Sequence, residues 1–254
     1  NREALRVMSC VIFCLLFGII GFIDDFAKVA KKQNEGLTPK QKLALQVVAA
    51  ILWLAAMYWL GDRSTTIDLV FVRFDIRWFY YPVMVLVILY LTNAVNLTDG
   101  VDGLCGTVTL VAMLIFTLIC SRLQMTSYTL FTMALAGGCL GFLVWNLHPA
   151  KCFMGDTGSM FLGAAVASVG LATHQHLVLI LVALVYILEA LSVMIQVTYF
   201  KYTKKKYGEG RRIFKMTPIH HHFEMSGFSE YKIVITFSLF GLIAGAVGLL
   251  LVTL

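Results

Sequence analysis

Acidic and histidine side chains interrupt an otherwise apolar chain at four short stretches. These are GFIDDF (21–26), NAVNLTDGVDGL (93–104), FMGDTGS (153–159) and PIHHHFE (218–224). The first three stretches lie beside runs of apolar residues, and the fourth lies in a polar loop before the last apolar run. Carboxylates inside a membrane are costly, and those that occur there are usually functional. The residues that could do chemistry in these stretches are Asp24, Asp25, Asp99, Asp102, Asp156, His220, His221, His222 and Glu224.

The five aspartates of these motifs, gathered at one place, would repel one another unless a cation lay between them. Hard oxygen donors with few soft ones favour Mg²⁺, or Mn²⁺, over zinc. Magnesium in proteins usually takes one or two carboxylates together with substrate phosphates. Lysines in the same loops indicate an anionic substrate, and Gly100 and Gly103 allow backbone to approach a ligand closely.

The elements that must position these residues are membrane helices. The chain has 254 residues, of which 59% are hydrophobic and 13% charged, with mean hydropathy +0.84. Soluble domains are nearer half apolar and a quarter charged. We therefore expect an all-α, polytopic transmembrane bundle that forms one domain over residues 1–254.

A membrane-spanning helix needs roughly 20 mostly apolar residues. Thr38 as N-cap, Pro39 at the first helical position and Gln41 at the third mark the start of the second helix. Residues 65–78 alternate in part between apolar and polar, which predicts a short hairpin at the membrane surface. The eight predicted spans are 4–23, 43–61, 81–97, 104–120, 129–146, 158–173, 177–200 and 232–253, of which the third and sixth are short.

The distribution of basic residues predicts the orientation of these spans. The loops on the side of residues 24–42 hold fourteen of the 20 Lys and Arg residues, Lys31 and Lys32 included. Cytoplasmic loops carry the excess of Lys and Arg, so this side is expected to be cytoplasmic. Alternating topology then brings all four motifs to the cytoplasmic face.

Simpler interpretations remain open for several of these residues. Asp24 and Asp25 could form only a solvated helix end, and Asp102 could merely cap the fourth span. The three histidines could be left from a tag or could bind zinc, although their spacing is not a usual zinc pattern. Glu189, in the middle of a predicted span, is expected to bond across a helix interface.

The four motifs resemble those of the polyprenyl-phosphate N-acetylhexosamine-1-phosphate transferases, and they occur in the order typical of that superfamily. The MTPIHHHFE stretch resembles its phospho-N-acetylmuramoyl-pentapeptide transferase family in particular. The resemblance runs along the whole chain. Members of this family begin with further helices and an inner loop, so we expect this chain to be partial.

The resemblance implies a Mg²⁺-dependent reaction in the bacterial cytoplasmic (inner) membrane. Phospho-MurNAc-pentapeptide passes from UDP-MurNAc-pentapeptide to undecaprenyl phosphate, giving lipid I and UMP for peptidoglycan synthesis. The lipid bilayer is a further expected partner, a homodimer is an open alternative, and nucleic acid is not expected. Alternatives to this function are a transferase that uses UDP-N-acetylglucosamine, an ion-coupled transporter and a purely structural bundle.

The resemblance also implies roles for individual residues. Asp156 corresponds to the Mg²⁺ ligand, and Asp24 and Asp25 correspond to the catalytic pair, of which one would be base or nucleophile. His221 and His222 would contact phosphates or orient the donor. The residues implied in substrate binding are Lys28, Asn96, Asp99, Asp102, Asn146, Phe153 (on the uracil ring) and His220.

Overall fold

The computed structural model describes residues 2–31 and 36–252, and within them the chain is almost entirely helical. A single two-stranded sheet accompanies the helices. The helices and strands are α1 (Arg2–Lys31), α2 (Pro39–Trp59), β1 (Thr66–Asp68), β2 (Arg73–Asp75), η1 (Arg77–Phe79), α3 (Tyr80–Thr98), α4 (Leu104–Arg122), α5 (Thr126–Asn146), α6 (Gly155–Ala172), α7 (His176–Val182), α8 (Leu184–Tyr207), α9 (Ile219–Glu224) and α10 (Glu230–Leu251).

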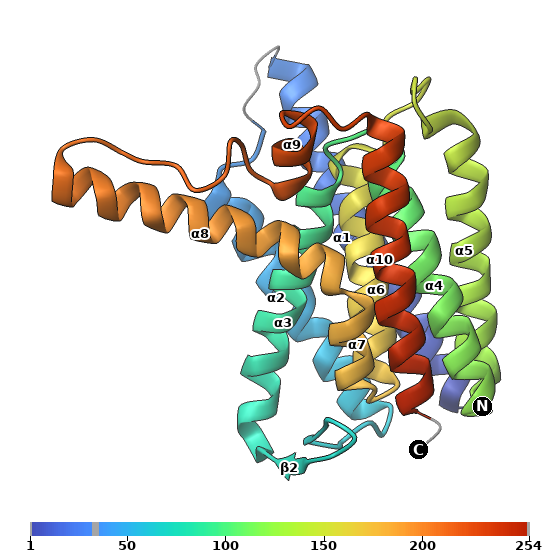
Figure 1. Ribbon diagram of the computed structural model, residues 1–254. Coiled ribbons are helices and arrows are strands. Elements are labelled where there is room, and N and C mark those ends of the chain that lie inside the picture. Colours follow the sequence, from blue (N-terminus) through green and yellow to red (C-terminus); the bar gives the residue numbers. More distant parts are fainter. Residues whose placement is uncertain (1, 32–35, 253–254) are drawn as a thin grey trace.

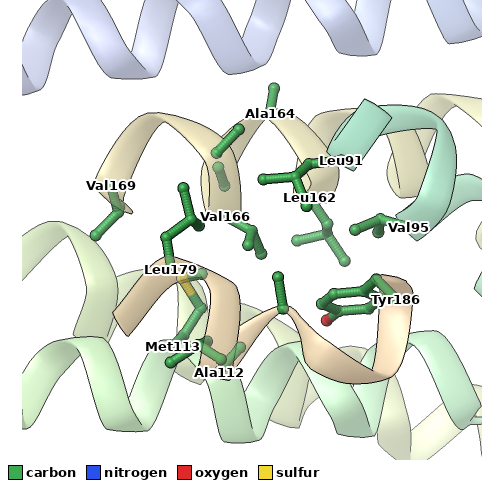
Figure 2. Packing of buried hydrophobic residues seen from close by; sticks show 14 of the residues in the cluster. Leu91, Val95, Ala112, Met113, Leu162, Ala164, Val166, Val169, Leu179 and Tyr186 are labelled. Carbon is green, nitrogen blue, oxygen red and sulfur yellow. The ribbon is translucent and has the colours of Figure 1, made fainter. Parts of the chain in front are cut away.

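The helix α6 forms the centre of the bundle. Every residue from Ser159 to Ala172 except Phe161 is buried, and most of them are Ala, Gly, Ser or Val. Small side chains let neighbouring helix backbones approach closely, and α6 packs against α1 on one side and α3 on another. Figure 2 shows Leu162, Val166 and their neighbours meeting side chains of α3, α4 and the α7–α8 segment in this core.

Hydroxyl groups join buried helix surfaces. The Tyr186 hydroxyl of α8 lies 2.8 Å from Oγ1 of Thr109 in α4. Thr117 of α4 donates to Thr132 of α5 at 2.9 Å. Such bonds satisfy polar groups that have no water to bind inside an apolar bundle.

Within the described residues, seven helices are long and apolar enough to cross a membrane: α1, α2, α3 with η1, α4, α5, α8 and α10. Large apolar side chains such as Leu86, Val144 and Ile235 are exposed on outward faces. The chain is therefore an integral membrane protein with a helical fold, as predicted. The sixth predicted span is the short helix α6, which the other helices enclose.

Two predicted span boundaries are wrong. The first span was expected to end at residue 23, but α1 continues to Lys31, so Asp24 and Asp25 lie within a helix and not at its end. The expected span 177–200 is divided at Ala183 into α7 and α8. In Figure 1, α8 leaves the bundle at a wide angle to α10 and projects to one side.

The remaining local predictions are confirmed. Thr38 caps α2 with a capping box to Gln41, and Pro39 starts the helix. β1 and β2 pair as an antiparallel hairpin. In Figure 1 this hairpin, the start of α1 and the end of α10 lie at the bottom of the bundle, whereas α9 lies at the top. Lys32 and the last residue of the expected span 232–253 lie outside the described residues.

Candidate active site

Three aspartates meet where α1 passes the start of α6. Carboxylate oxygens of Asp24, Asp25 and Asp156 all lie within 4.8 Å of one another. The two helices can approach because residue 21 is glycine: a Cβ there would collide with the backbone carbonyl of Asp156. We call these three residues the carboxylate cluster.

Two lysines neutralise the carboxylate cluster. Nζ of Lys28 lies 2.9 Å from Asp24, 2.9 Å from Asp156 and 3.3 Å from Asp25. Nζ of Lys42, from α2, lies 3.0 Å from Asp156 and 3.6 Å from Asp24. Lys28 was predicted as a site residue. Lys42 was counted only as a loop lysine, because nothing in the sequence connects the start of α2 to the start of α6.

Asp24 and Asp25 have different surroundings, since adjacent side chains on a helix point about 100° apart. Asp24 is 4% exposed and accepts a hydrogen bond from the backbone N–H of Leu37 at 2.7 Å. Asp25 accepts from both the N–H and the hydroxyl of Thr157, at 3.1 and 3.2 Å, in the first turn of α6. The pair is therefore not a solvated helix end.

A cleft of about 650 Å³ opens beside the carboxylate cluster, between α1, α2 and α3. Asp24, Lys28 and Lys42 line it, together with Gln46 and Asn93, which bond to each other at 2.9 Å. Sequence reasoning missed Gln46 and Asn93. Polar residues inside the apolar stretches 43–61 and 81–97 were the available signal.

Polar residues of α3 complete this end of the site. Asn96 donates 2.8 Å hydrogen bonds to Asp156 and to Ser159. Asp99 follows the last turn of α3, where burial first, and then the charges of Asp156 and Asp25, raise the pKa of its carboxyl group to about 6. Asp99 therefore belongs electrostatically to the carboxylate cluster, and Asn96 holds Asp156 in place.

The donor set of the carboxylate cluster fits a hard divalent cation. Three aspartates supply only oxygen ligands, which suits Mg²⁺ or Mn²⁺ and does not suit a soft metal. In this structure the positive charge of Lys28 offsets the negative charge of the three aspartates. A bound cation would neutralise that charge together with the lysine.

Asp102 lies in a second group of side chains and not in the carboxylate cluster. Its carboxylate accepts from the backbone N–H of Ala150 at 2.9 Å and lies 3.2 Å from Nδ1 of His148. The same nitrogen lies 3.1 Å from Glu230 at the start of α10. The N-cap of α4 is Gly103 in a left-handed conformation, so Asp102 is not the cap of that helix.

Asn146 is the last residue of α5, and Phe153 lies in the segment between α5 and α6. Asn146 is 3% exposed; its carbonyl accepts from the N–H of Gly103 and its amide donates to the carbonyl of Cys152. Both ends of this side chain are thus occupied within the protein, and Asn146 braces the loop. Phe153 is 76% exposed and available to a ligand.

The three histidines differ in their surroundings. His220 is fully buried, and a Cβ at residue 100 would collide with its Nε2. His221 lies beside it, with the ring centroids 4.2 Å apart and the ring planes tilted by 57°, and bonds to Glu224 at 2.8 Å. His222 accepts from the backbone N–H of Lys215 at 3.1 Å and so faces the preceding loop.

Glu189 explains the burial of His220. The two side chains are both fully buried, and the glutamate oxygen lies 3.0 Å from Nδ1 of the histidine. Glu189 comes from α8 and His220 from α9, so the predicted bond across a helix interface is confirmed. A buried polar side chain needs such a partner.

Comparison with known proteins defines the class. The model of the glycosyl transferase family 4 matches residues 7–174, so the helical bundle belongs to a class of membrane-embedded phospho-sugar transferases. Curated relatives named phospho-N-acetylmuramoyl-pentapeptide-transferase share 43% identity over 241 residues in Halalkalibacterium halodurans and 44% over 237 residues in Acetivibrio thermocellus. Those matches cover 94% and 91% of this chain, and 72% and 69% of the relatives. The chain belongs to glycosyl transferase family 4 and, within it, to the phospho-N-acetylmuramoyl-pentapeptide-transferases.

Proposed function

We propose that this chain transfers phospho-MurNAc-pentapeptide from UDP-MurNAc-pentapeptide to undecaprenyl phosphate, with UMP and lipid I as products. The observation that carries the proposal is the carboxylate cluster, held between Lys28 and Lys42 beside a cleft of about 650 Å³. The cleft lies at one end of the membrane helices, where a lipid-borne acceptor and a water-borne donor can meet. Residues 1–254 act as one transferase domain.

Phosphoryl transfer depends mainly on positioning and on neutralising charge. Lys28 and Lys42 are cations already directed at the cluster, and they suit the phosphates of donor and acceptor. Asp24 lines the cleft, so it is placed to accept a proton from the lipid phosphate as that oxygen attacks the sugar-linked phosphorus. UMP then leaves as the phosphorus–oxygen bond to it breaks.

We further propose that Asp156, with Asp24 and Asp25, holds Mg²⁺, for which Mn²⁺ can substitute. The cation would supply charge neutralisation to the donor diphosphate. Phe153 offers a flat, exposed ring for the uracil face, because aromatic rings stack on any base. Asp99 and Asp102 flank the loop at the end of α3 that would face the nucleoside. We assign contact with the phosphates or orientation of the donor to His221 and His222, and a role in substrate binding to His220.

The proposed location is the bacterial cytoplasmic (inner) membrane, with the active site on the cytoplasmic face. The excess of Lys and Arg at the site end of the helices supports this orientation. An ion-coupled transporter would carry its ionisable groups near the membrane midplane. Here the groups proposed to act on the substrates lie at one end of the bundle, and Glu189 is already bonded to His220.

The test is release of UMP from purified protein with undecaprenyl phosphate and Mg²⁺. Two donors are compared, UDP-MurNAc-pentapeptide and UDP-N-acetylglucosamine. We expect turnover with the first donor only, its loss on chelation with EDTA, and its recovery with Mg²⁺. Asp156→Ala should remain folded in detergent and be inactive. Turnover with UDP-N-acetylglucosamine alone would overturn the assignment of the donor. Wild-type turnover in Asp156→Ala would overturn the assignment of Asp156 as a metal ligand.

A further inference from the structure

One histidine ties together three segments that are distant in the sequence. Nδ1 of His148, after α5, lies 3.2 Å from Asp102 in the α3–α4 loop and 3.1 Å from Glu230 at the start of α10. Glu230 in turn accepts a hydrogen bond from the backbone N–H of Asp102 at 3.2 Å. Each segment is thus bonded to the other two. We call Asp102, His148 and Glu230 the histidine clasp.

A neighbouring tyrosine strengthens the clasp. The Tyr231 hydroxyl donates to the backbone carbonyl of His148, and its ring meets the imidazole edge-on, with centroids 5.6 Å apart. Asp102 also accepts from the N–H of Ala150 at 2.9 Å. The loop after α5 is therefore fixed on both sides of Pro149. A side chain of α10 binds His148, and a side chain of the α3–α4 loop binds Ala150.

The same loop carries the base-binding candidate. Phe153 lies five residues after His148 and is 76% exposed, with the buried Asn146 bracing the loop at Cys152 and Gly103. An exposed ring binds a base tightly only if the backbone that carries it is already ordered. Otherwise the free-energy cost of ordering the loop reduces the binding free energy. Asp102 lies on the other segment that the clasp fixes.

We propose that His148, Glu230 and Tyr231 are positioning residues for the nucleoside end of the donor. They hold the Phe153 loop and Asp102 in the geometry that binds the uracil ring, and they act through those residues without touching the phosphates. This inference rests on the proposed function, in which the donor is a uridine diphosphate sugar.

The histidine clasp is held together by an imidazole N–H group and does not need a metal ion. Oxygens of Asp102 and Glu230 already accept backbone N–H groups, from Ala150 and Asp102 respectively. The imidazole N–H fills the space between the two carboxylates. A ring nitrogen that donates to both keeps the segments together without any added ion.

The test uses three variants in the full chain. His148→Ala removes the clasp, and Tyr231→Phe removes one hydroxyl only. His148→Asn keeps a donor close to the place of Nδ1 and should recover most of the loss. The control is His174→Ala, which breaks a 2.7 Å histidine–aspartate contact with Asp62 near the hairpin end of the bundle.

We expect the KM for UDP-MurNAc-pentapeptide to rise about tenfold in His148→Ala and about threefold in Tyr231→Phe, as for the loss of one or two hydrogen bonds. The kcat and the KM for undecaprenyl phosphate should stay unchanged. UMP affinity, measured by calorimetry, should fall by the same factors. The control His174→Ala is expected to lower the melting temperature without changing either KM.

Two results would overturn the inference. One is an unchanged donor KM and UMP affinity in both His148→Ala and Tyr231→Phe. The other is a rise in donor KM that accompanies a lower melting temperature in the control His174→Ala as well as in the clasp variants. The clasp would then contribute only to stability. Failure of the proposed function is distinguishable: wild-type protein that binds UMP but transfers no sugar refutes the reaction alone. Wild-type protein that binds no UMP refutes both.

Discussion

Asp24 and Asp25 are adjacent in the sequence, yet they face different parts of the site. Asp24 is buried at the wall of the cleft and accepts from Leu37 and Lys28. Asp25 is directed at the first turn of α6, where Thr157 supplies two donors. Carboxylates with different partners can perform different tasks, and the proposed mechanism brings the lipid phosphate to the cleft wall.

Substitution by Asn should separate the roles of Asp24 and Asp25. Asn keeps the shape and removes charge and basicity, so packing is not confounded. Asp24→Asn should bind donor and Mg²⁺ nearly normally but lower turnover by about 10²–10⁴-fold, as expected on losing a general base. Asp25→Asn should mainly weaken the binding of donor and Mg²⁺. Steady-state kinetics and calorimetry measure both effects.

Two outcomes would change this mechanism. If Asp24 were an obligate nucleophile, Asp24→Asn would have no residual turnover, and wild type without the lipid would accumulate a phospho-sugar adduct. Near-full turnover in both Asn variants would show that the pair has no catalytic role.

Phe153 allows a second prediction at this scale. Its ring is 76% exposed, so Phe153→Ala removes little internal packing. Loss of stacking on uracil should cost ~1–3 kcal/mol of donor binding, or roughly a tenfold to hundredfold rise in Kd. The matched control is Phe71→Ala in the hairpin, which is also 76% exposed. An equal effect of the two substitutions would remove Phe153 from the nucleoside site.

At the scale of elements, α8 and α9 depend on each other. No proline or glycine marks the break at Ala183, so the sequence gives no local reason for α8 to leave the bundle. Polar side chains of α8 supply the reason. Glu189 binds His220, and Gln196 binds the backbone of Phe214 and Ile213. These bonds hold the histidine-bearing segment against α8.

Breaking the Glu189–His220 pair should therefore destabilise the fold. Glu189→Ala leaves the buried histidine without its partner, which typically costs about 3–5 kcal/mol. Glu189→Gln keeps an acceptor and should cost less. The control Glu224→Ala breaks the 2.8 Å contact with His221 at the surface and should cost at most about 1 kcal/mol. Unfolding in detergent measures the difference, and equal losses for Glu189→Ala and Glu224→Ala would contradict this account.

At the scale of the whole molecule, the two ends of the bundle differ in charge and in chemistry. The end with α9 holds the carboxylate cluster, the histidine clasp and most of the basic residues, while the hairpin, the start of α1 and the end of α10 lie at the other end. The positive-inside rule then predicts that the α9 end faces the cytoplasm. The loop between α5 and α6 carries the one exposed cysteine, Cys152, and the other five are buried.

Cys152 provides a direct test of this orientation. A membrane-impermeant maleimide should label it in inverted inner-membrane vesicles and fail to label it from outside in spheroplasts. Cys152→Ser should abolish labelling, because the remaining cysteines are inaccessible. Labelling from outside only would reverse the orientation and place the site on the wrong face for a cytosolic donor.

The sequence by itself determined much of this protein. Long apolar runs have no stable alternative to helices in lipid, so the class of fold and most spans followed from composition. Local rules also gave the cap at Thr38 and the hairpin. The polar motifs grouped Asp24, Asp25, Asp99, Asp102 and Asp156, since carboxylates beside apolar runs need a shared explanation, and the family resemblance added Asn96.

Only the tertiary structure decided which of these residues meet. It extended α1 beyond the aspartate pair, added Lys42 and the Gln46–Asn93 pair to the cleft, and separated Asp102 from the carboxylate cluster. It also bent the chain at Ala183 so that Glu189 could bind His220. The physical reason is that periodicity and propensity act over a few residues. These contacts join residues up to 128 positions apart, as between Lys28 and Asp156, and depend on how whole helices pack.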